Sequence, residues 1–168
     1  MNINFYSQLK KNLQGELRED FDLSKSNWLG IGGKAKFFFK PKDLKDLQIF
    51  LRNNNQLFPI IVIGSGSNLL IRDKGFNGIV IKFGKDFDYI KVNNEIINCG
   101  PSTQKSLLAE HAANSSLTGF EFLYCIPGTV AGGVVMNSGC YGFDMSKIVL
   151  SISIIDMSGE IKIINNED

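Results

Sequence analysis

Residues 61–71 read IVIGSGSNLLI, and the first half of the chain is best interpreted outward from this stretch. The apolar, β-branched run at 60–63 predicts a short buried strand that ends in small residues. Leu69 stands where a dinucleotide-binding fingerprint needs its third glycine, and the Gly-Lys of a phosphate-binding P-loop is missing. Because Leu69, Leu70 and Ile71 are strand-like, the loop is predicted to join two strands rather than to open a helix.

The small residues of this loop have two interpretations. Their consecutive backbone N–H groups and two serine hydroxyls are suited to an anion-binding nest that needs no cationic side chain. The alternative is a plain tight turn between two strands, and the loop alone leaves both open. The residues concerned are Gly64, Ser65, Gly66, Ser67 and Asn68.

A second glycine-rich stretch, IPGTVAGGVVMNSGCYG, occupies residues 126–142. Pro127 and Gly128 indicate a turn, and the small residues after them let the backbone approach a ligand or another element closely. Close helix–sheet packing is the alternative explanation. Neither stretch has a nucleophile, a metal-ligand cluster or an acid–base pair beside it. The two stretches together therefore predict a phosphate-bearing cofactor that supplies the chemistry itself.

The composition excludes several classes of protein. The chain has 168 residues, 43% hydrophobic and 21% charged, with a formal net charge of +1, which is ordinary for a soluble globular protein. It has no clustered basic face of the kind that nucleic-acid binding requires, and no membrane-spanning stretch is expected. Cys99, Cys125 and Cys140, with one histidine in the chain, fit neither a disulfide framework nor a zinc site. Reduced thiols predict a cytoplasmic protein.

The periodicity of apolar residues predicts alternating helices and strands. The N-terminal helix is indicated by one apolar stripe, Phe5, Leu9, Leu13 and Leu17. The first half is predicted to form a helix over 3–18, a strand over 35–39, a helix from 43 to 53–55 and a strand over 60–63, the last three being a βαβ unit. The second half is predicted to form strands over 69–71, 79–82, 87–92 and 95–99, a helix capped by Ser102 or Thr103 that runs to about 114, and strands over 148–155 and 160–164 with a turn at 158–159.

Three motifs in order resemble one family. NxLGIGGxA at 27–35, IVIGSGSNLLI at 61–71 and GFEFLYCIPGTVAGGVVMNSGCYG at 119–142 are similar to the UDP-N-acetylenolpyruvoylglucosamine reductases of bacterial peptidoglycan synthesis. The resemblance implies an α+β fold with two FAD-binding lobes of the vanillyl-alcohol-oxidase/PCMH type, the C-terminal substrate lobe being absent. It divides the chain into a lead-in at 1–26, a first lobe at 27–82 and a second lobe at 83–168, truncated at its C-terminal end.

The resemblance also implies an activity and a site. In the family, NADPH reduces FAD, and the flavin passes hydride to the enolpyruvyl group on UDP-N-acetylglucosamine, which gives UDP-N-acetylmuramate. The loop at 64–68 would hold the FAD diphosphate, and the second stretch would line the adenosine and the flavin ring. The implied cofactor-binding residues are Gly64, Ser65, Gly66, Ser67, Asn68, Leu69, Ile126, Pro127, Gly128, Thr129, Gly132, Gly133, Val135, Asn137 and Gly139.

The departures from the family pattern limit what the chain is expected to do. Trp28 replaces the usual threonine and would crowd the cofactor if it pointed inward, while Cys125 and Cys140 replace small residues. The arginine, serine and glutamate that act on the substrate in the family would lie beyond Asp168, so no catalytic residue is assigned. We therefore expect a chain that binds FAD weakly or not at all and does not turn over. An intact enzyme seen in part, a split protein with a separate C-terminal half, a decayed remnant and, as the poorest fit, a related flavin oxidase remain as alternatives.

Overall fold

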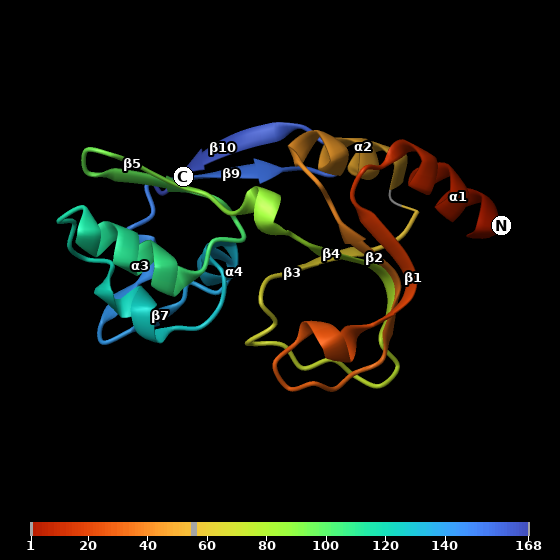
Figure 1. The fold of residues 1–168 in the computed structure, drawn as a ribbon, viewed down its shortest axis with the longest axis horizontal. Helices are drawn as coiled ribbons and strands as arrows, with labels where there is room; N and C mark the ends of the chain where they lie inside the picture. Colours follow the sequence, from red (N-terminus) through yellow and green to blue (C-terminus); the bar gives the residue numbers. More distant parts are fainter. Residues whose placement is uncertain (1, 55–56, 168) are drawn as a thin grey trace.

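The chain folds into two lobes of mixed α and β structure that lie side by side (Figure 1). The computed structural model describes residues 2–54 and 57–167, without the side chains of residues 2–5 and 8. The first lobe contains α1 (Asn2–Asn12), β1 (Glu16–Asp22), η1 (Leu23–Ser26), β2 (Lys34–Lys40), α2 (Leu44–Asn54), β3 (Ile60–Ile63) and β4 (Phe76–Lys82). Its sheet has the order β1-β2-β4-β3, with β1 antiparallel to β2 and the other neighbours parallel.

The central strand β2 is buried on both faces, which explains its run of three phenylalanines. Phe37 and Phe39 belong to the core under α1 and α2, and the ring of Phe39 stacks on Phe50 of α2 with centroids 4.3 Å apart. Phe38 points to the opposite face and packs with Leu23. A continuous apolar run is typical of an inner parallel strand covered on both sides. The predicted βαβ unit is confirmed, with β4 inserted between its two strands.

The second lobe follows β4 and builds a separate core. Its elements are η2 (Lys85–Phe87), β5 (Ile90–Asn93), β6 (Ile96–Cys99), α3 (Lys105–Asn114), η3 (Glu121–Cys125), α4 (Val130–Val135), β7 (Gly139–Cys140), β8 (Phe143–Asp144), η4 (Met145–Lys147), β9 (Ser151–Ile155) and β10 (Ile161–Asn165). The buried core residues include Leu108 of α3, Leu123 of η3 and Met145 of η4. The lobe therefore has its own apolar centre beside that of the first lobe.

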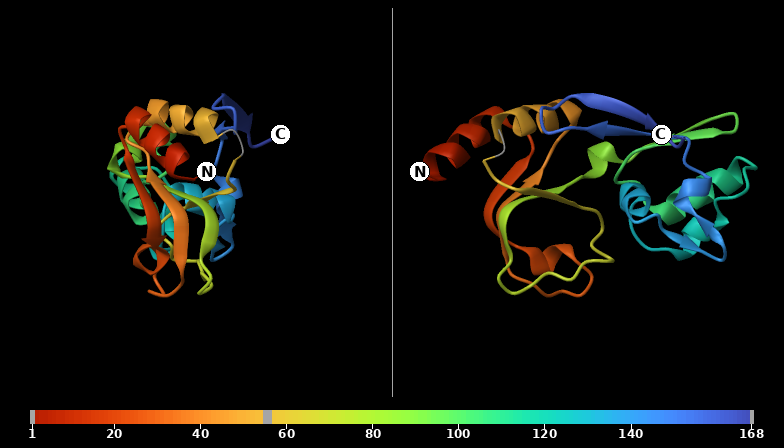
Figure 2. Two further views of the ribbon diagram at one scale, coloured as in Figure 1. Left: turned by 90° about the vertical axis from the view of Figure 1, so that its right-hand side faces the viewer. Right: turned by 180° about the vertical axis from the view of Figure 1, so that it is seen from behind.

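The β9–β10 hairpin connects the two lobes. It runs from the second lobe back across the first, with its turn over α2 (Figures 1 and 2). Gln48 Nε2 of α2 donates a hydrogen bond to the Gly159 carbonyl at 2.9 Å, and Arg52 Nε donates to the Ser158 carbonyl at 3.3 Å. Ile155 packs against the core of the first lobe. These contacts fix the hairpin to α2.

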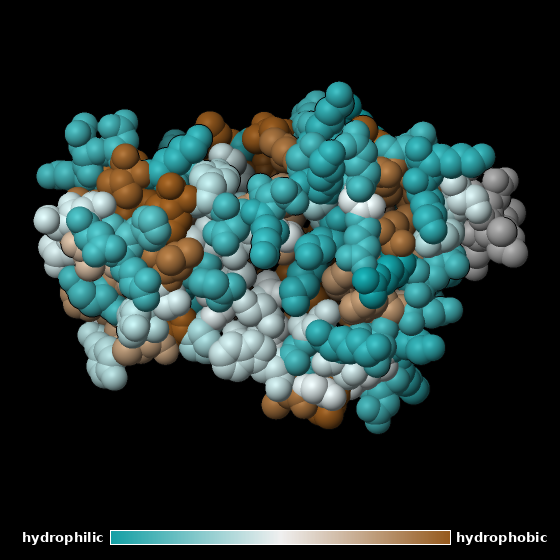
Figure 3. Space-filling model, viewed as in Figure 1, coloured by the Kyte–Doolittle hydropathy of each residue, from teal (hydrophilic) through white to brown (hydrophobic). Residues whose placement is uncertain are grey.

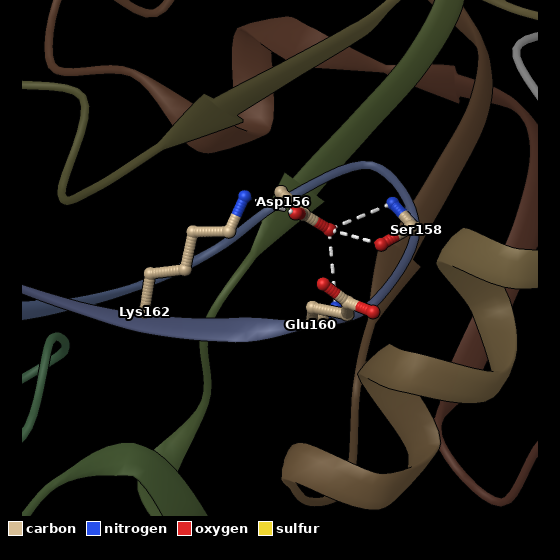
Figure 4. Close-up of polar contacts among 4 residues, drawn as sticks. All are labelled: Asp156, Ser158, Glu160 and Lys162. Atoms are coloured by element: carbon tan, nitrogen blue, oxygen red, sulfur yellow. Dashed lines mark hydrogen bonds and ion pairs between the residues drawn. The ribbon is translucent and has the colours of Figure 1, made fainter.

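One carboxylate organises the turn of this hairpin (Figure 4). Asp156 Oδ1 accepts hydrogen bonds from the backbone N–H groups of Ser158 at 2.9 Å and Glu160 at 3.1 Å, and from the Ser158 hydroxyl. Lys162 Nζ lies 2.9 Å from Asp156 Oδ2. The Ser158 hydroxyl first, and then Lys162 and the backbone donors, hold the pKa of Asp156 well below its ordinary value.

The Asp156 carboxylate should make stability depend on pH. Because its pKa is lower in the folded chain than in the unfolded chain, its contribution is complete above about pH 4 and is lost as the pH falls towards the folded pKa. Asp156→Asn should therefore lower the thermal midpoint at pH 7. The difference in thermal midpoint between the variant and wild type should become smaller as the pH is lowered. Glu160→Gln is the control, because only the backbone of Glu160 bonds to Asp156. A constant difference across the acid range would contradict the prediction.

Five predicted elements differ from the structure, and one of them is the strand predicted over 79–82, which starts earlier, at Phe76. The N-terminal helix ends at Asn12 instead of 18, and Leu17 lies in β1, because the chain turns sharply at Gly15, where a Cβ would lie 2.3 Å from the Lys40 carbonyl oxygen. Residues 69–71 form no strand and belong to a loop that leads to β4. The strands predicted over 87–92 and 148–155 start later, at Ile90 and Ser151, because short 3-10 turns precede them. The Phe5 side chain lies outside the described residues.

Candidate functional site

The two glycine-rich stretches meet between the lobes. The loop after β3 lies on the side of the first lobe that faces the second (Figures 1 and 2). A Cβ on Gly64 would lie 2.6 Å from Thr129 Oγ1, and a Cβ on Gly128 would lie 3.0 Å from Ser67 Oγ. Gln104 Nε2 donates to Ser65 Oγ at 3.4 Å. We call this meeting of residues 64–68 with residues 126–129 the loop junction.

The first loop of the junction rests on the segment that follows η1. Gly66 has φ +75°, and a Cβ there would lie 2.3 Å from the Ser26 carbonyl oxygen and 2.6 Å from Asn27 Cα. Trp28 N–H donates to the Gly66 carbonyl at 3.1 Å. Asn27 Nδ2 in turn donates to the carbonyls of Leu23 and Ile31, both at 2.8 Å. Glycine is therefore required at position 66 for both its backbone angle and its space.

The donors of this loop are available to a ligand. Within residues 2–54 and 57–167, the backbone N–H groups at positions 65–68 donate no hydrogen bond. Because an unpaired backbone donor is costly once buried, such a row needs either water or a bound acceptor. Successive free N–H groups on small residues are the chemistry of an anion nest. The residues present therefore fit a diphosphate.

The second loop leads into a short helix that the sequence did not predict. Thr129 precedes α4, and its Oγ1 accepts a hydrogen bond from Gly132 N–H at 3.3 Å. The backbone of this loop is fixed to the start of α3, since Lys105 N–H donates to the Gly128 carbonyl at 3.0 Å and Val130 N–H donates to the Thr103 carbonyl at 2.8 Å. Gln104, not Ser102 or Thr103, precedes α3, because the Thr103 hydroxyl donates to Asp88 Oδ1 instead.

The predicted site residues divide into two groups. Gly64, Ser65, Gly66, Ser67, Gly128 and Thr129 lie at the junction through the contacts given above. Asn68, Ile126 and Pro127 also belong to the junction segments. Leu69, Gly132, Gly133, Val135, Asn137 and Gly139 lie further along the chain, and several of the predicted residues have packing roles. Asn137 Oδ1 accepts from Ser146 N–H at 2.9 Å, and Gly139 pairs with Asp144 in the β7–β8 ribbon. Leu69 packs against the first lobe, Ile126 packs against the core of the second lobe, and Val135 is 83% exposed.

A hydrophobic surface lies beside the first loop. Trp28 is 64% exposed, and Leu29 and Ile31 are exposed as well, so the Trp28 side chain does not fill the interior. Figure 3 shows a hydrophobic area at the lower edge of the molecule, where Figure 1 places the loop after η1. Asn27 Oδ1 below this loop is buried without a hydrogen-bond partner in the part of the chain that the structure describes.

Glu121 and the three cysteines show no sign of a catalytic arrangement among the described residues. Glu121 accepts from the Thr118 hydroxyl at 2.9 Å and from Gly119 N–H at 2.8 Å, so it supports the turn before η3. The three cysteines are free thiols, and burial raises the pKa of Cys99. The described residues include no group of three or more histidine, cysteine, aspartate or glutamate side chains that could hold a metal ion. Among the same residues, no helix has the length and apolar character to cross a bilayer.

Sequence reasoning missed Lys105. This lysine is 3% exposed, and its Nζ donates to Ser138 Oγ at 3.3 Å. Its stem lies beside two glycines of the second stretch, Gly128 and Gly133: a Cβ on Gly133 would lie 3.0 Å from Lys105 Cδ, and one on Gly128 would lie 3.9 Å from Nζ. Lysine is rarely buried without a partner, and the local sequence pattern at 103–105 does not predict that this side chain is buried.

The comparisons with known proteins place the chain in a class. The FAD binding domain family matches residues 35–165, and the chain therefore belongs to that family. Solved oxidases share the fold: 6-hydroxy-D-nicotine oxidase from Arthrobacter nicotinovorans aligns with a TM-score of 0.65 and 17% identity, over 93% of this chain and 37% of that one. The 4-ethylphenol oxidase from Gulosibacter chungangensis aligns with a TM-score of 0.69 and 18% identity, over 96% of this chain and 34% of that one.

More similar proteins narrow the relationship to one kind of enzyme. UDP-N-acetylenolpyruvoylglucosamine reductase from Pelagibacter ubique (strain HTCC1062) is 40% identical, over 96% of this chain and 54% of the relative. That of Rickettsia rickettsii (strain Sheila Smith) is 42% identical, over 93% and 53%. The crystal structure of the UDP-N-acetylenolpyruvylglucosamine reductase from Thermus caldophilus aligns with a TM-score of 0.74 and 27% identity, over 92% of this chain and 53% of that one. The predicted resemblance and fold class are thus confirmed, and the chain spans about half the length of the curated relatives that it matches.

Proposed function

We propose that the loop junction binds the diphosphate of FAD, and that the chain is the FAD-binding part of an NADPH-dependent reductase in peptidoglycan synthesis. The reaction would convert UDP-N-acetylglucosamine enolpyruvate to UDP-N-acetylmuramate. The observation that carries the proposal is the contact between two glycine-rich loops of different lobes. In one of them, the N–H groups at 65–68 donate to no acceptor in the described part of the chain. Membership of the FAD binding domain family and the similarity to these reductases support the identity of the ligand.

The chain's own residues would bind and orient the cofactor. The N–H groups at 65–68 would donate to the diphosphate oxygens, and Gly128 would let a ligand approach the backbone of the second loop. When bound, FAD would supply the hydride-transfer chemistry between NADPH and the enolpyruvyl group. We further propose that residues 27–82 and 83–168 contribute the two sides of the site. Contacts with the adenosine and the ring from Asn68, Leu69, Ile126, Pro127, Gly132, Gly133, Val135, Asn137 and Gly139 also stay a proposal.

The groups that act on the substrate would come from the part of the relatives that this chain does not match. We place the expected arginine, serine and glutamate there and assign a UDP-sugar substrate and a cytoplasmic location by the same similarity. A split enzyme with a separate C-terminal half is the second candidate. It is favoured by the exposed apolar side chains Ile161 and Ile163 on β10, at 48% and 69% exposure. Figure 3 shows hydrophobic surface at the upper edge, where β9 and β10 lie.

FAD titration of the purified chain tests the proposal. We expect saturable quenching of flavin fluorescence with weak affinity, and no NADPH oxidation by the chain alone. Co-purification of a second polypeptide that restores NADPH oxidation would support the split enzyme. A chain that is folded by circular dichroism and shows no saturable FAD binding would contradict the proposal that the loop junction of this chain binds FAD unaided. An aggregation-prone chain without flavin absorbance would favour the decayed remnant.

A further inference from the structure

We propose that Lys105 is an anion-binding residue of the loop junction, whose ammonium group adds a fixed positive charge to the backbone N–H groups of the first loop. The identity of the ligand as the FAD diphosphate rests on the proposed function. The charge itself follows from the position of Lys105, which the sequence pattern and the family resemblance leave without a role. The sequence predicted a diphosphate held by main-chain amides alone.

The position of the side chain is the first part of the argument. Lys105 is the first residue of α3, and its own N–H donates to the Gly128 carbonyl. Its ammonium group then lies beside Gly128, with Nζ 3.9 Å from where a Cβ on Gly128 would be. Gly128 also faces Ser67 Oγ across the junction, with 3.0 Å between a built Cβ and that oxygen. Lys105 therefore places its charge at the point where the second loop meets the predicted anion nest.

The lack of a counter-charge is the second part. The ion pairs in the described parts of the chain, 2–54 and 57–167, are Arg18 with Glu16 and Lys162 with Asp156, and neither includes Lys105. Among the described residues, Nζ donates one hydrogen bond, to the neutral hydroxyl of Ser138, at the long distance of 3.3 Å. Burial lowers the pKa of the Lys105 ammonium group, which is the direction expected when a charge is desolvated without compensation. A buried ammonium in this condition destabilises the fold unless an anion binds beside it.

A role of Lys105 in binding and a role in folding predict opposite effects of its replacement on the stability of the ligand-free chain. If Lys105 serves the fold, its replacement by an apolar side chain of similar length should lower the thermal midpoint of the ligand-free chain. If it serves an anion, the same replacement removes an uncompensated charge and should leave that midpoint unchanged or raise it. The replacement should lower the thermal midpoint, relative to wild type, only when a phosphate-bearing ligand is present.

The experiment compares Lys105→Met with wild type in two measurements. The first is the rise in thermal midpoint caused by inorganic pyrophosphate, which should be lost in the variant. The second is the affinity for FAD relative to riboflavin, which lacks phosphate: FAD affinity should fall by about 10-fold or more, as expected for a hydrogen bond to a charged group, while riboflavin affinity stays the same. Lys105→Gln serves as a second charge-free variant.

Lys74→Met is the matched control, because it removes the same net charge from an exposed position six residues after the first loop in the sequence. It should behave as wild type in both measurements. The inference is overturned if Lys105→Met keeps the pyrophosphate response, or if it weakens FAD and riboflavin equally. If wild type binds neither FAD nor riboflavin but still responds to pyrophosphate through Lys105, the proposed function fails and the anion site stands.

Discussion

Gly66→Ala should lower the affinity for FAD by about 100-fold, through one backbone position that accepts no side chain. The alanine Cβ would lie 2.3 Å from the Ser26 carbonyl oxygen and 2.6 Å from Asn27 Cα, which are backbone atoms that cannot rotate away. The φ of +75° adds strain for any residue other than glycine. The loop must therefore lift from the 26–28 segment, and the N–H groups at 65–68 lose their common direction. Flavin fluorescence titration measures the loss.

The control for this variant is Gly142→Ala. Gly142 has φ +80°, but a Cβ there would meet nothing within 4 Å, so the substitution introduces the backbone strain without the collision. We expect about 1 kcal/mol of destabilisation and no change in FAD affinity. Circular dichroism must show that both variants are folded. FAD binding by Gly66→Ala at wild-type strength would mean that the first loop is not the diphosphate site.

The main elements could be predicted because their signals are local. The apolar runs at 35–39 and 60–63 and the helical spacing from Leu44 to Leu51 appear in the structure as β2, β3 and α2. The N-terminal helix was extended too far because Leu17 continues the apolar stripe of Leu9 and Leu13. What ends that helix is a carboxylate 31 residues away, which binds the backbone at Gly15. A single-sequence pattern contains no such information.

The candidate site could be predicted in part for the same reason. Glycine-rich loops are visible in the sequence, and the expectation that both belong to one site agrees with the contact between Gly64 and Thr129. The short helix α4 was missed because its two glycines are poor helix formers, and it is held by the Thr129 cap and by packing. Lys105 was missed because its burial depends on three separate segments, at 105, 128–133 and 138.

Asp46→Ala should cause the largest loss of stability among these variants, about 3 kcal/mol or more. Asp46 lies in α2 and is 3% exposed, and its carboxylate accepts hydrogen bonds from the backbone N–H groups of Gln14 at 2.9 Å, Gly15 at 2.8 Å and Lys42 at 3.0 Å. These bonds join the start of β1, the segment after β2 and the first turn of α2. Alanine would remove three part-buried hydrogen bonds to a carboxylate, and a hydrogen bond to a charged group contributes about 1.5–3 kcal/mol.

The comparison that isolates this effect is Asp43→Ala. Asp43 precedes the same helix, is exposed, and makes one such bond, from Asp46 N–H to Asp43 Oδ1 at 2.8 Å. Loss of a helix-capping bond of this kind costs about 1 kcal/mol. The free energy of unfolding in urea should therefore be highest for wild type, lower for Asp43→Ala and much lower for Asp46→Ala. The thermal midpoint should fall by roughly 2–4 °C for each kcal/mol of stability lost. Equal losses in the two variants would show that the three-donor carboxylate does not hold β1 to α2, since its extra bonds would then contribute nothing to the stability of the first lobe.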